Sequence, residues 1–229
     1  AGGPRDSNQQ IAGAGGEPAP GGGAICDAGC GLGFSSLALA PYFQKVVAAD
    51  RSAEALAVLR RKNTCPNLEI REGDLFAQPP DTPYDAMLFC FFGSAEEILR
   101  CARQQCQGRV VVVKPTQSRH RFSREQVPDH RQVSAALEDR LAALGVPFGR
   151  RELTLRLDQP LKSVDDGLRF FRLYSRDADP REITGDFVRA RLEPLDDPDY
   201  PYRLPVERQV SVLSFDAKDI PSETERSLE

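Results

Sequence analysis

The sequence lacks several features that would place it at once in a common class of protein. No apolar run approaches the roughly 20 residues of a membrane span, and no signal-peptide pattern appears, so we expect a cytoplasmic protein without a membrane segment. The six cysteines form no C-x-x-C pair, which argues against a zinc site or a thioredoxin-like motif, and we expect no metal. The formal net charge of -4 argues against a nucleic-acid partner, because phosphate backbones bind Lys and Arg.

The most informative segment that is present is residues 24–34, Ala-Ile-Cys-Asp-Ala-Gly-Cys-Gly-Leu-Gly-Phe. A short apolar run ends in Asp27, glycines follow at alternate positions, and a helix-compatible run comes next. This pattern predicts a buried parallel strand that turns tightly into a helix and leaves its backbone open to a ligand. The turn differs from the dinucleotide fingerprint G-x-G-x-x-G, because the third glycine comes one residue early, at Gly33, and Phe34 stands in its place. A carboxylate at Asp27 repels phosphate and attracts a ligand that carries positive charge.

The resulting pattern D-x-G-x-G-x-G resembles motif I of the class I S-adenosylmethionine-dependent methyltransferases. The resemblance implies S-adenosylmethionine as cofactor, with its ammonium and sulfonium groups, and S-adenosylhomocysteine as product. It also implies an α/β fold: a Rossmann-like, mostly parallel seven-stranded sheet with an antiparallel last strand, helices on both faces and a helical insertion between strands six and seven. In order of elements it extends from about Ala24 to Phe215, although only the first half carries specific motifs.

Strand and helix signals alternate from Ala24 onward, which predicts a mostly parallel sheet with right-handed crossovers. The expected strands are residues 24–28, 46–50, 68–71, 84–92, 109–114, 151–157 and 207–215. The expected helices are residues 34–39, 52–63, 94–108, 133–144, a helix capped by Ser163, and about 180–192. Residues 1–23 are rich in Gly, Pro and Ala, which predicts a flexible tail before one methyltransferase domain at residues 24–229.

The resemblance also assigns roles to individual residues. The glycine turn lies against the methionine part of the cofactor. Asp50, 21 residues after Gly29, binds both ribose hydroxyls, which suits a carboxylate because its two oxygens accept from two donors. Asp74 accepts from the adenine amino group, with Leu75 against the base. Phe91, Phe92 and Gly93 suggest an apolar wall beside the sulfonium. The expected cofactor-binding residues are Asp27, Gly29, Cys30, Gly31, Gly33, Asp50, Arg51, Asp74, Leu75 and Phe91.

Plainer interpretations of the same residues stay open. Asp27 and Asp50 also suit helix or turn caps, Asp74 an ordinary turn, and Phe91 a buried aromatic position. The only two histidines, His120 and His130, follow the fifth strand in an Arg-rich segment, where solvent exposure is the plainer interpretation. We name His130 as the candidate general base, which is needed only for a hydroxyl, thiol or protonated amine as acceptor.

The function expected is methyl transfer by in-line displacement to a small-molecule acceptor. The turn after the fourth strand, Cys90-Phe-Phe-Gly-Ser94, lacks the Asn/Asp-Pro-Pro-Tyr/Phe motif of DNA amino-group methylases, which disfavours DNA. Residues 158–206 are rich in aromatics and are expected over the active-site face, as a lid. The alternatives are a protein or RNA acceptor, a non-catalytic cofactor- or partner-binding module, and an NAD(P)-dependent oxidoreductase, which Phe34 argues against. The methylated atom and the oligomeric state stay open.

Overall fold

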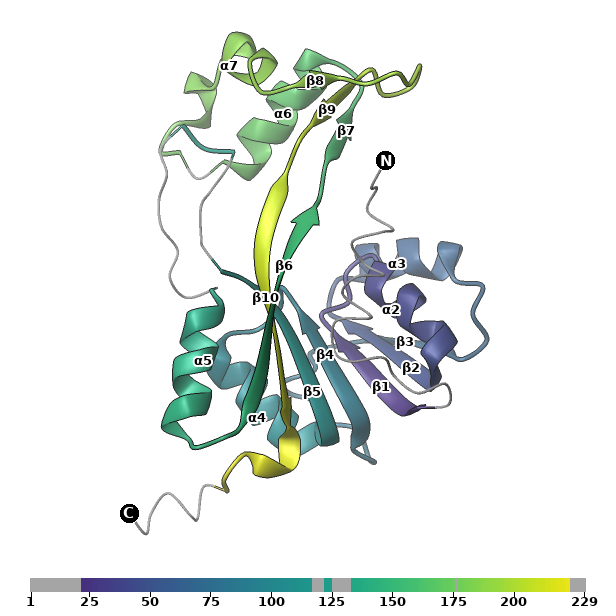
Figure 1. Cartoon of the computed structure of the whole chain (residues 1–229). Helices are drawn as coiled ribbons and strands as arrows, with labels where there is room; N and C mark the ends of the chain where they lie inside the picture. Colours follow the sequence, from purple (N-terminus) through teal and green to yellow (C-terminus); the bar gives the residue numbers. More distant parts are fainter. Residues whose placement is uncertain (1–21, 117–121, 125–132, 176, 223–229) are drawn as a thin grey trace.

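The computed structural model of the chain describes residues 22–116, 122–124, 133–175 and 177–222. Its main sheet has seven strands in the order β3-β2-β1-β4-β5-β10-β6 (Figure 1). Strands β1 to β5 pair in parallel, and β10 runs antiparallel to both β5 and β6. The expected sheet, with an antiparallel last strand next to the fifth, is therefore confirmed. The strands are β1 (Gly22–Ala28), β2 (Phe43–Asp50), β3 (Leu68–Glu72), β4 (Tyr84–Cys90), β5 (Cys106–Pro115), β6 (Phe148–Arg156) and β10 (Glu207–Asp216).

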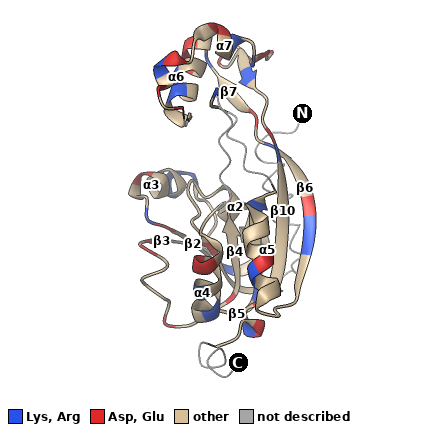
Figure 2. Cartoon of the chain, turned by 90° about the vertical axis from the view of Figure 1, so that its left-hand side faces the viewer, with Lys and Arg blue, Asp and Glu red and all other residues tan. Residues whose placement is uncertain are grey.

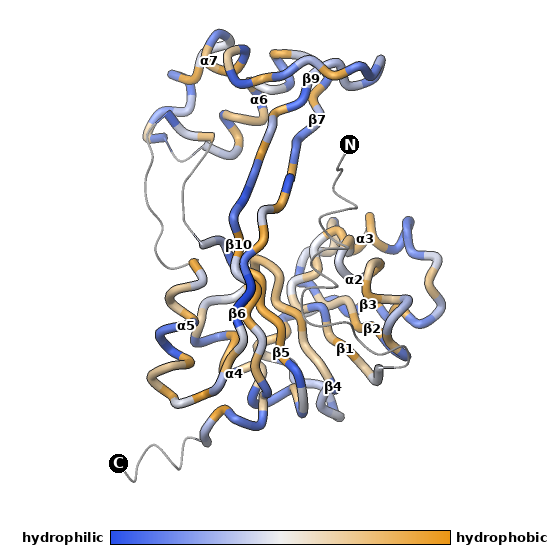
Figure 3. Tube along the Cα trace, in the orientation of Figure 1, coloured by the Kyte–Doolittle hydropathy of each residue, from blue (hydrophilic) through white to orange (hydrophobic). Residues whose placement is uncertain are grey.

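Helices cover both faces of this sheet, and each face has its own apolar cluster. Successive side chains of a strand point to opposite faces of the sheet. Figure 3 shows the central strands as largely hydrophobic. In β4, Met87 and Phe89 pack with α4 and α5, whereas Leu88 packs with α2 and α3 on the other face. The helices are α2 (Phe34–Leu39), α3 (Ala53–Lys62), α4 (Ala95–Gln105) and α5 (Ser134–Ala143), with short 3-10 turns at η1 (Ala40–Tyr42) and η4 (Ala217–Asp219). The helices expected on both faces are thus confirmed.

Several strand boundaries differ from the expected ones, and β2, β5 and β6 each begin three residues earlier than expected. β1 begins at Gly22, two residues before the expected start, and the rest of the expected tail, residues 1–21, lies outside the described residues. β4 ends at Cys90 instead of continuing through Phe92. It ends there because Phe91 has a φ of 55°, a left-handed conformation that breaks the extended backbone and that few residues other than glycine adopt.

Between β6 and β10 the chain forms a small unit of its own. A three-stranded sheet in the order β7-β9-β8 packs with α6 and α7. Hydrophobic side chains of this unit form a separate core. The elements are β7 (Gln159–Leu161), α6 (Val164–Tyr174), η3 (Pro180–Glu182), α7 (Gly185–Arg189), β8 (Glu193–Pro194) and β9 (Tyr202–Leu204). The buried core residues are Leu161, Phe171, Ile183, Val188, Leu204 and Val206.

The expected helix over residues 180–192 is wrong. The chain forms the 3-10 turn η3, passes through an extended residue at Ile183, and starts α7 afresh at Thr184, whose hydroxyl accepts from the Phe187 amide. Thr184 therefore caps a second short helix instead of continuing the first. The strands β7 to β9 were not expected either, because two or three residues are too short to show a strand period.

The insertion stands beyond the carboxyl ends of the parallel strands (Figure 1). Pro115, at the end of β5, pairs with Val210 near the start of β10, and β10 begins where the chain leaves the insertion. The segment after β5 also contacts this unit, because the Phe122 ring packs edge-on against Phe170 and Phe171. Within the described part of the chain, no helix is long and apolar enough to cross a membrane.

Candidate functional site

The turn after β1 has all three glycines in the left-handed region, with φ of 67°, 53° and 75° at Gly29, Gly31 and Gly33. Two of them permit close packing: a Cβ at Gly29 would lie 2.2 Å from the Phe92 ring, and one at Gly33 would lie 2.3 Å from the Leu59 side chain. A Cβ at Gly31 would meet nothing within 4 Å. The sequence therefore needs glycine at 29 and 33 for packing, and Gly31 leaves backbone facing open space.

Asp50, at the end of β2, holds this turn in place. One carboxylate oxygen accepts from the Gly31 amide at 2.7 Å, and the other accepts from the Ser52 amide at 2.8 Å. The carbonyl of Ala49 accepts from the amides of Gly29 and Cys30 next to it. A carboxylate offers about four acceptor positions, so these two bonds leave Asp50 able to accept from a bound diol.

Asp27 lies beneath the turn and is 1% exposed. One of its oxygens accepts from the Ser35 and Ser36 hydroxyls at 2.7 and 2.5 Å, so it ties down the first turn of α2. The other oxygen, Oδ1, is buried without a hydrogen-bond partner among the described residues. Burial raises the pKa of Asp27, the two hydroxyls lower it, and nearby Asp50 raises it. Asp27 thus anchors two hydroxyls of α2 without capping the helix, whose N-cap residue is Gly33, and one acceptor atom of Asp27 is left unused.

A cleft of about 250 Å³ opens at the carboxyl ends of β2, β3 and β4. Asp50, Asp74 and Glu97 bring carboxylates to its lining, and Phe76 and Phe92 bring aromatic rings. These rings stack in parallel with their centroids 5.2 Å apart. Asp74 accepts from the Phe76 amide at 2.9 Å, which fixes the loop after β3. The cleft therefore combines flat apolar walls with an acidic rim, an arrangement suited to a planar ligand that carries hydroxyl or cationic groups.

Residues 25–107 match the model of a protein family described as a methyltransferase domain. This part of the chain is similar to that family. The match runs from β1 to the start of β5, so it includes the glycine turn, Asp50 and every residue that lines the cleft. The family that the sequence resembles is thereby confirmed. A search of curated proteins finds no match to the sequence.

Solved structures share the fold of the methyltransferase domain and of the rest of the chain. YcgJ from Bacillus subtilis is 12% identical, with 91% of this chain and 97% of that chain covered and a TM-score of 0.58. A predicted methyltransferase from Bacillus halodurans is 13% identical, with 92% and 98% covered and a TM-score of 0.56. A precorrin 8w decarboxylase from Methanobacterium thermoautotrophicum is 20% identical, with 90% and 88% covered and a TM-score of 0.50.

Most of the residues expected from the sequence do meet at one edge of the methyltransferase domain. Four of them line the cleft, and the glycine turn with Asp27 and Cys30 adjoins it through the Gly31–Asp50 bond and the Gly29–Phe92 contact. The four are Asp50, Arg51, Asp74 and Leu75. Leu75 is 6% exposed and belongs to the core, so the cleft meets mainly its edge. The roles of all these residues stay predictions.

One expected residue is not brought into the cleft, and another lies outside the described residues. Phe91 lies outside its lining, packs in the apolar cluster under α2 and α3, and has the Arg208 guanidinium 5.5 Å above its ring. Its neighbour Phe92 does line the cleft. The left-handed backbone at Phe91 directs the Phe92 side chain, and not that of Phe91, toward the cleft. His130 lies outside the described residues. Among the residues that are described, no group of three or more His, Cys, Asp or Glu gathers as metal ligands would.

Sequence reasoning missed Phe76 and Glu97 as lining residues. Phe76 follows the expected Asp74-Leu75 pair directly, and an aromatic at that position was a usable signal. Ser94-x-x-Glu97 is a capping-box pattern, and the structure forms the full box. That pattern predicts a helix start but does not show that the start borders a cleft.

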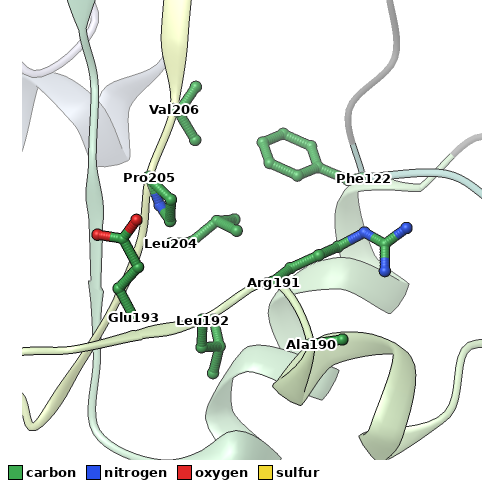
Figure 4. Close-up of a pocket in the computed structure, with 8 residues that line it drawn as sticks. All are labelled: Phe122, Ala190, Arg191, Leu192, Glu193, Leu204, Pro205 and Val206. Carbon is green, nitrogen blue, oxygen red and sulfur yellow. The ribbon is translucent and has the colours of Figure 1, made fainter.

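A second pocket, of about 370 Å³, lies in the insertion and shares no lining residue with the methyltransferase cleft. Figure 4 shows Phe122, Leu204 and Val206 on its apolar walls, with the chain at Arg191 along another side. The Arg191 guanidinium lies 3.5 Å from the centre of the Phe187 ring, which holds it in a fixed place. The pocket therefore offers apolar surface, the positive Arg191 and the negative Glu193, which pairs with Arg203.

We predict that the carboxyl groups of Asp27 and Asp85 have opposite effects on how the free energy of unfolding depends on pH. Burial raises the pKa of Asp27 above its unfolded value near 3.8. The contribution of Asp27 to the free energy of unfolding is therefore fully present below that pH and is lost as the pH rises through the folded pKa. Asp27→Asn should therefore gain free energy of unfolding relative to wild type between about pH 4 and about pH 7. Urea unfolding at both pH values measures this.

Asp85→Asn is the matched control. Bonds from the Ala24 amide and the Gln107 side chain lower the pKa of Asp85, so its contribution is present above its unfolded pKa and lost as the pH falls. The Asp85 variant should lose stability relative to wild type as the pH rises from about 2.5 to about 4, toward its unfolded pKa near 3.8, and should change little from there to about pH 7. The same pH trend in both variants would show that Asp27 is not a buried carboxyl of raised pKa.

Proposed function

We propose that this protein is an S-adenosylmethionine-dependent methyltransferase that acts on a small-molecule acceptor. The observation that carries the proposal is the acidic cleft at the carboxyl edge of a methyltransferase domain, next to a glycine turn and a buried carboxylate oxygen without a partner. Ligands of open α/β sheets bind at this edge.

The residues present fit that cofactor. The unused Oδ1 of Asp27 is an acceptor for an ammonium group beside the glycine turn, reached directly or through a water. Asp50 has acceptor positions for the two ribose hydroxyls, and Asp74 has them for the adenine amino group. The rings of Phe76 and Phe92 offer a flat surface to the base.

When bound, the cofactor supplies an electrophilic methyl group to an in-line displacement whose leaving group needs no proton. The task left to the chain is to position the reactants and to exclude water. Asp50 and the glycine turn, which the Gly31–Asp50 hydrogen bond joins, would orient the ligand by further hydrogen bonds. Phe92 and Phe76 keep water from the apolar side of the cleft. A residue that takes a proton from the acceptor is required only for some acceptors.

A small acceptor is supported by the charges of the insertion. Figure 2 shows acidic and basic residues mixed along its helices. Arg124 pairs with Glu182, Arg181 with Asp179, and Arg203 with Glu193 at 2.7 Å. Over the described residues of this unit, such paired charges form no continuous basic surface for a nucleic-acid backbone. The second pocket, which has apolar walls, the Arg191 guanidinium and the Glu193 carboxylate, suits a partly apolar molecule with polar groups.

We predict that the wild-type protein binds S-adenosylhomocysteine with a Kd in the micromolar range, measured by calorimetric titration. Asp50→Ala should weaken this binding at least about tenfold, because it removes charge-assisted hydrogen bonds to the ribose. Glu69→Gln is the control, since Glu69 is an exposed carboxylate of the neighbouring strand that pairs with Lys45, and its Kd should equal that of wild type. NADH is titrated in parallel, and binding of NADH alone would make the protein an oxidoreductase instead.

We also predict that the insertion is needed for turnover and not for cofactor binding. The Leu157 amide donates to the Val206 carbonyl at 2.7 Å, so the chain enters and leaves the insertion at neighbouring positions. A Gly-Gly turn can therefore replace residues 159–204. The shortened protein should bind S-adenosylhomocysteine as wild type does. It should no longer transfer a labelled methyl group to an acceptor that the wild type uses, found by screening small molecules. Full activity after the deletion would refute the lid.

A further inference from the structure

A lysine at the carboxyl end of β5 is almost fully buried, and the proposed function leaves it without a role. Lys114 is 2% exposed, and its Nζ donates to the backbone carbonyl of Gly93 in the turn after β4. Burial lowers the pKa of Lys114, and the nearby Glu97 raises it. Buried lysines are rare unless a specific partner holds them, so this contact needs an explanation.

The other end of the same peptide group is held by a carboxylate. The Ser94 amide and the Ser94 hydroxyl both donate to the Glu97 side chain, at 2.8 and 2.9 Å. These bonds lower the pKa of Glu97. The Gly93–Ser94 peptide therefore has a cation on its carbonyl oxygen and an anion on its N–H. Each charge matches the partial charge that it meets, and bonds to charged groups are stronger than neutral ones.

The peptide held in this way borders the cleft. Gly93, Ser94 and Glu97 all line it, and Phe92, just before them, stacks on Phe76 and packs against Gly29. The preceding Phe91 has its left-handed φ of 55°, a conformation that persists only where the surroundings enforce it.

Val113 and Lys114, two consecutive residues of β5, hold the backbone at Phe91 in this conformation by hydrogen bonds. The Phe91 amide donates to the Val113 carbonyl at 2.9 Å, and Lys114 follows with its bond to Gly93. The end of β5 therefore fixes the turn after β4 at both of its ends.

We propose that Lys114 is a positioning residue of the cofactor cleft, which together with Glu97 fixes the Gly93–Ser94 peptide and so places the Phe92 ring as a cleft wall. The inference rests on the proposed function, because the cleft that it shapes is the one assigned to the cofactor. Lys114 acts through the backbone of the turn and not by contact with a ligand.

The test compares Lys114→Met, Glu97→Gln and the double variant, with calorimetric titration of S-adenosylhomocysteine as one measurement. Each single variant should weaken binding about tenfold, the size of one bond to a charged group. The double variant should be about as weak as the weaker single one, because both act on one peptide and their effects do not add. Val110→Ala is the control for stability, since Val110 is buried in the same strand away from the turn. It should lower Tm and leave Kd unchanged.

Hydrogen exchange of the Ser94 amide in the free protein is the second measurement, and it needs no ligand. Exchange should be at least about tenfold faster in Lys114→Met and unchanged in Val110→Ala. Unchanged exchange in Lys114→Met would refute the hold on the peptide, and faster exchange with a wild-type Kd would refute the effect on the cleft. If the wild-type protein binds no S-adenosylhomocysteine, the proposed function is refuted. Hydrogen exchange of the Ser94 amide then tests only whether Lys114 holds the Gly93–Ser94 peptide.

Discussion

The hydrogen bond from the Gly31 amide to the Asp50 carboxylate is the contact on which the site depends. It joins the turn after β1 to the end of β2, and β2 in turn carries the loop that leads to Ser52 and α3. Because the glycine at 31 faces open space, the bond holds backbone in the left-handed region without filling the cleft. The turn, the acidic rim and the packing of Phe92 on Gly29 all follow from where this bond places the chain.

The second constraint is electrostatic. Asp27, Asp50 and Asp74 lie at or beside one cleft, and burial leaves one oxygen of Asp27 without a partner. A buried acceptor atom without a hydrogen-bond partner destabilises the fold by about 1–3 kcal/mol. Sites that accept such a cost are commonly functional, because a ligand that donates to the free oxygen recovers part of it. A cationic ligand with a diol and an amino group matches these acceptors in kind.

The sheet and the main site residues could be predicted because their signals are local. The alternate glycines after Asp27, and an acid at the end of each of two strands, mark the carboxyl edge within a few residues of chain. Phe91 could not be predicted, because an aromatic in an apolar run looks like strand and its left-handed backbone depends on bonds from β5. Lys114 looked like an ordinary strand end, since its burial comes from the distant turn that it contacts. The insertion's short strands and the split between η3 and α7 show no period that a sequence can reveal.

The most direct test of this account is a crystal structure of the protein with S-adenosylhomocysteine. The account predicts the ribose hydroxyls on Asp50, the amino group of the homocysteine part within reach of Asp27 Oδ1, and the adenine against Phe76 with its amino group toward Asp74. A ligand held in the pocket of the insertion, or one whose ribose lies away from Asp50, would contradict it.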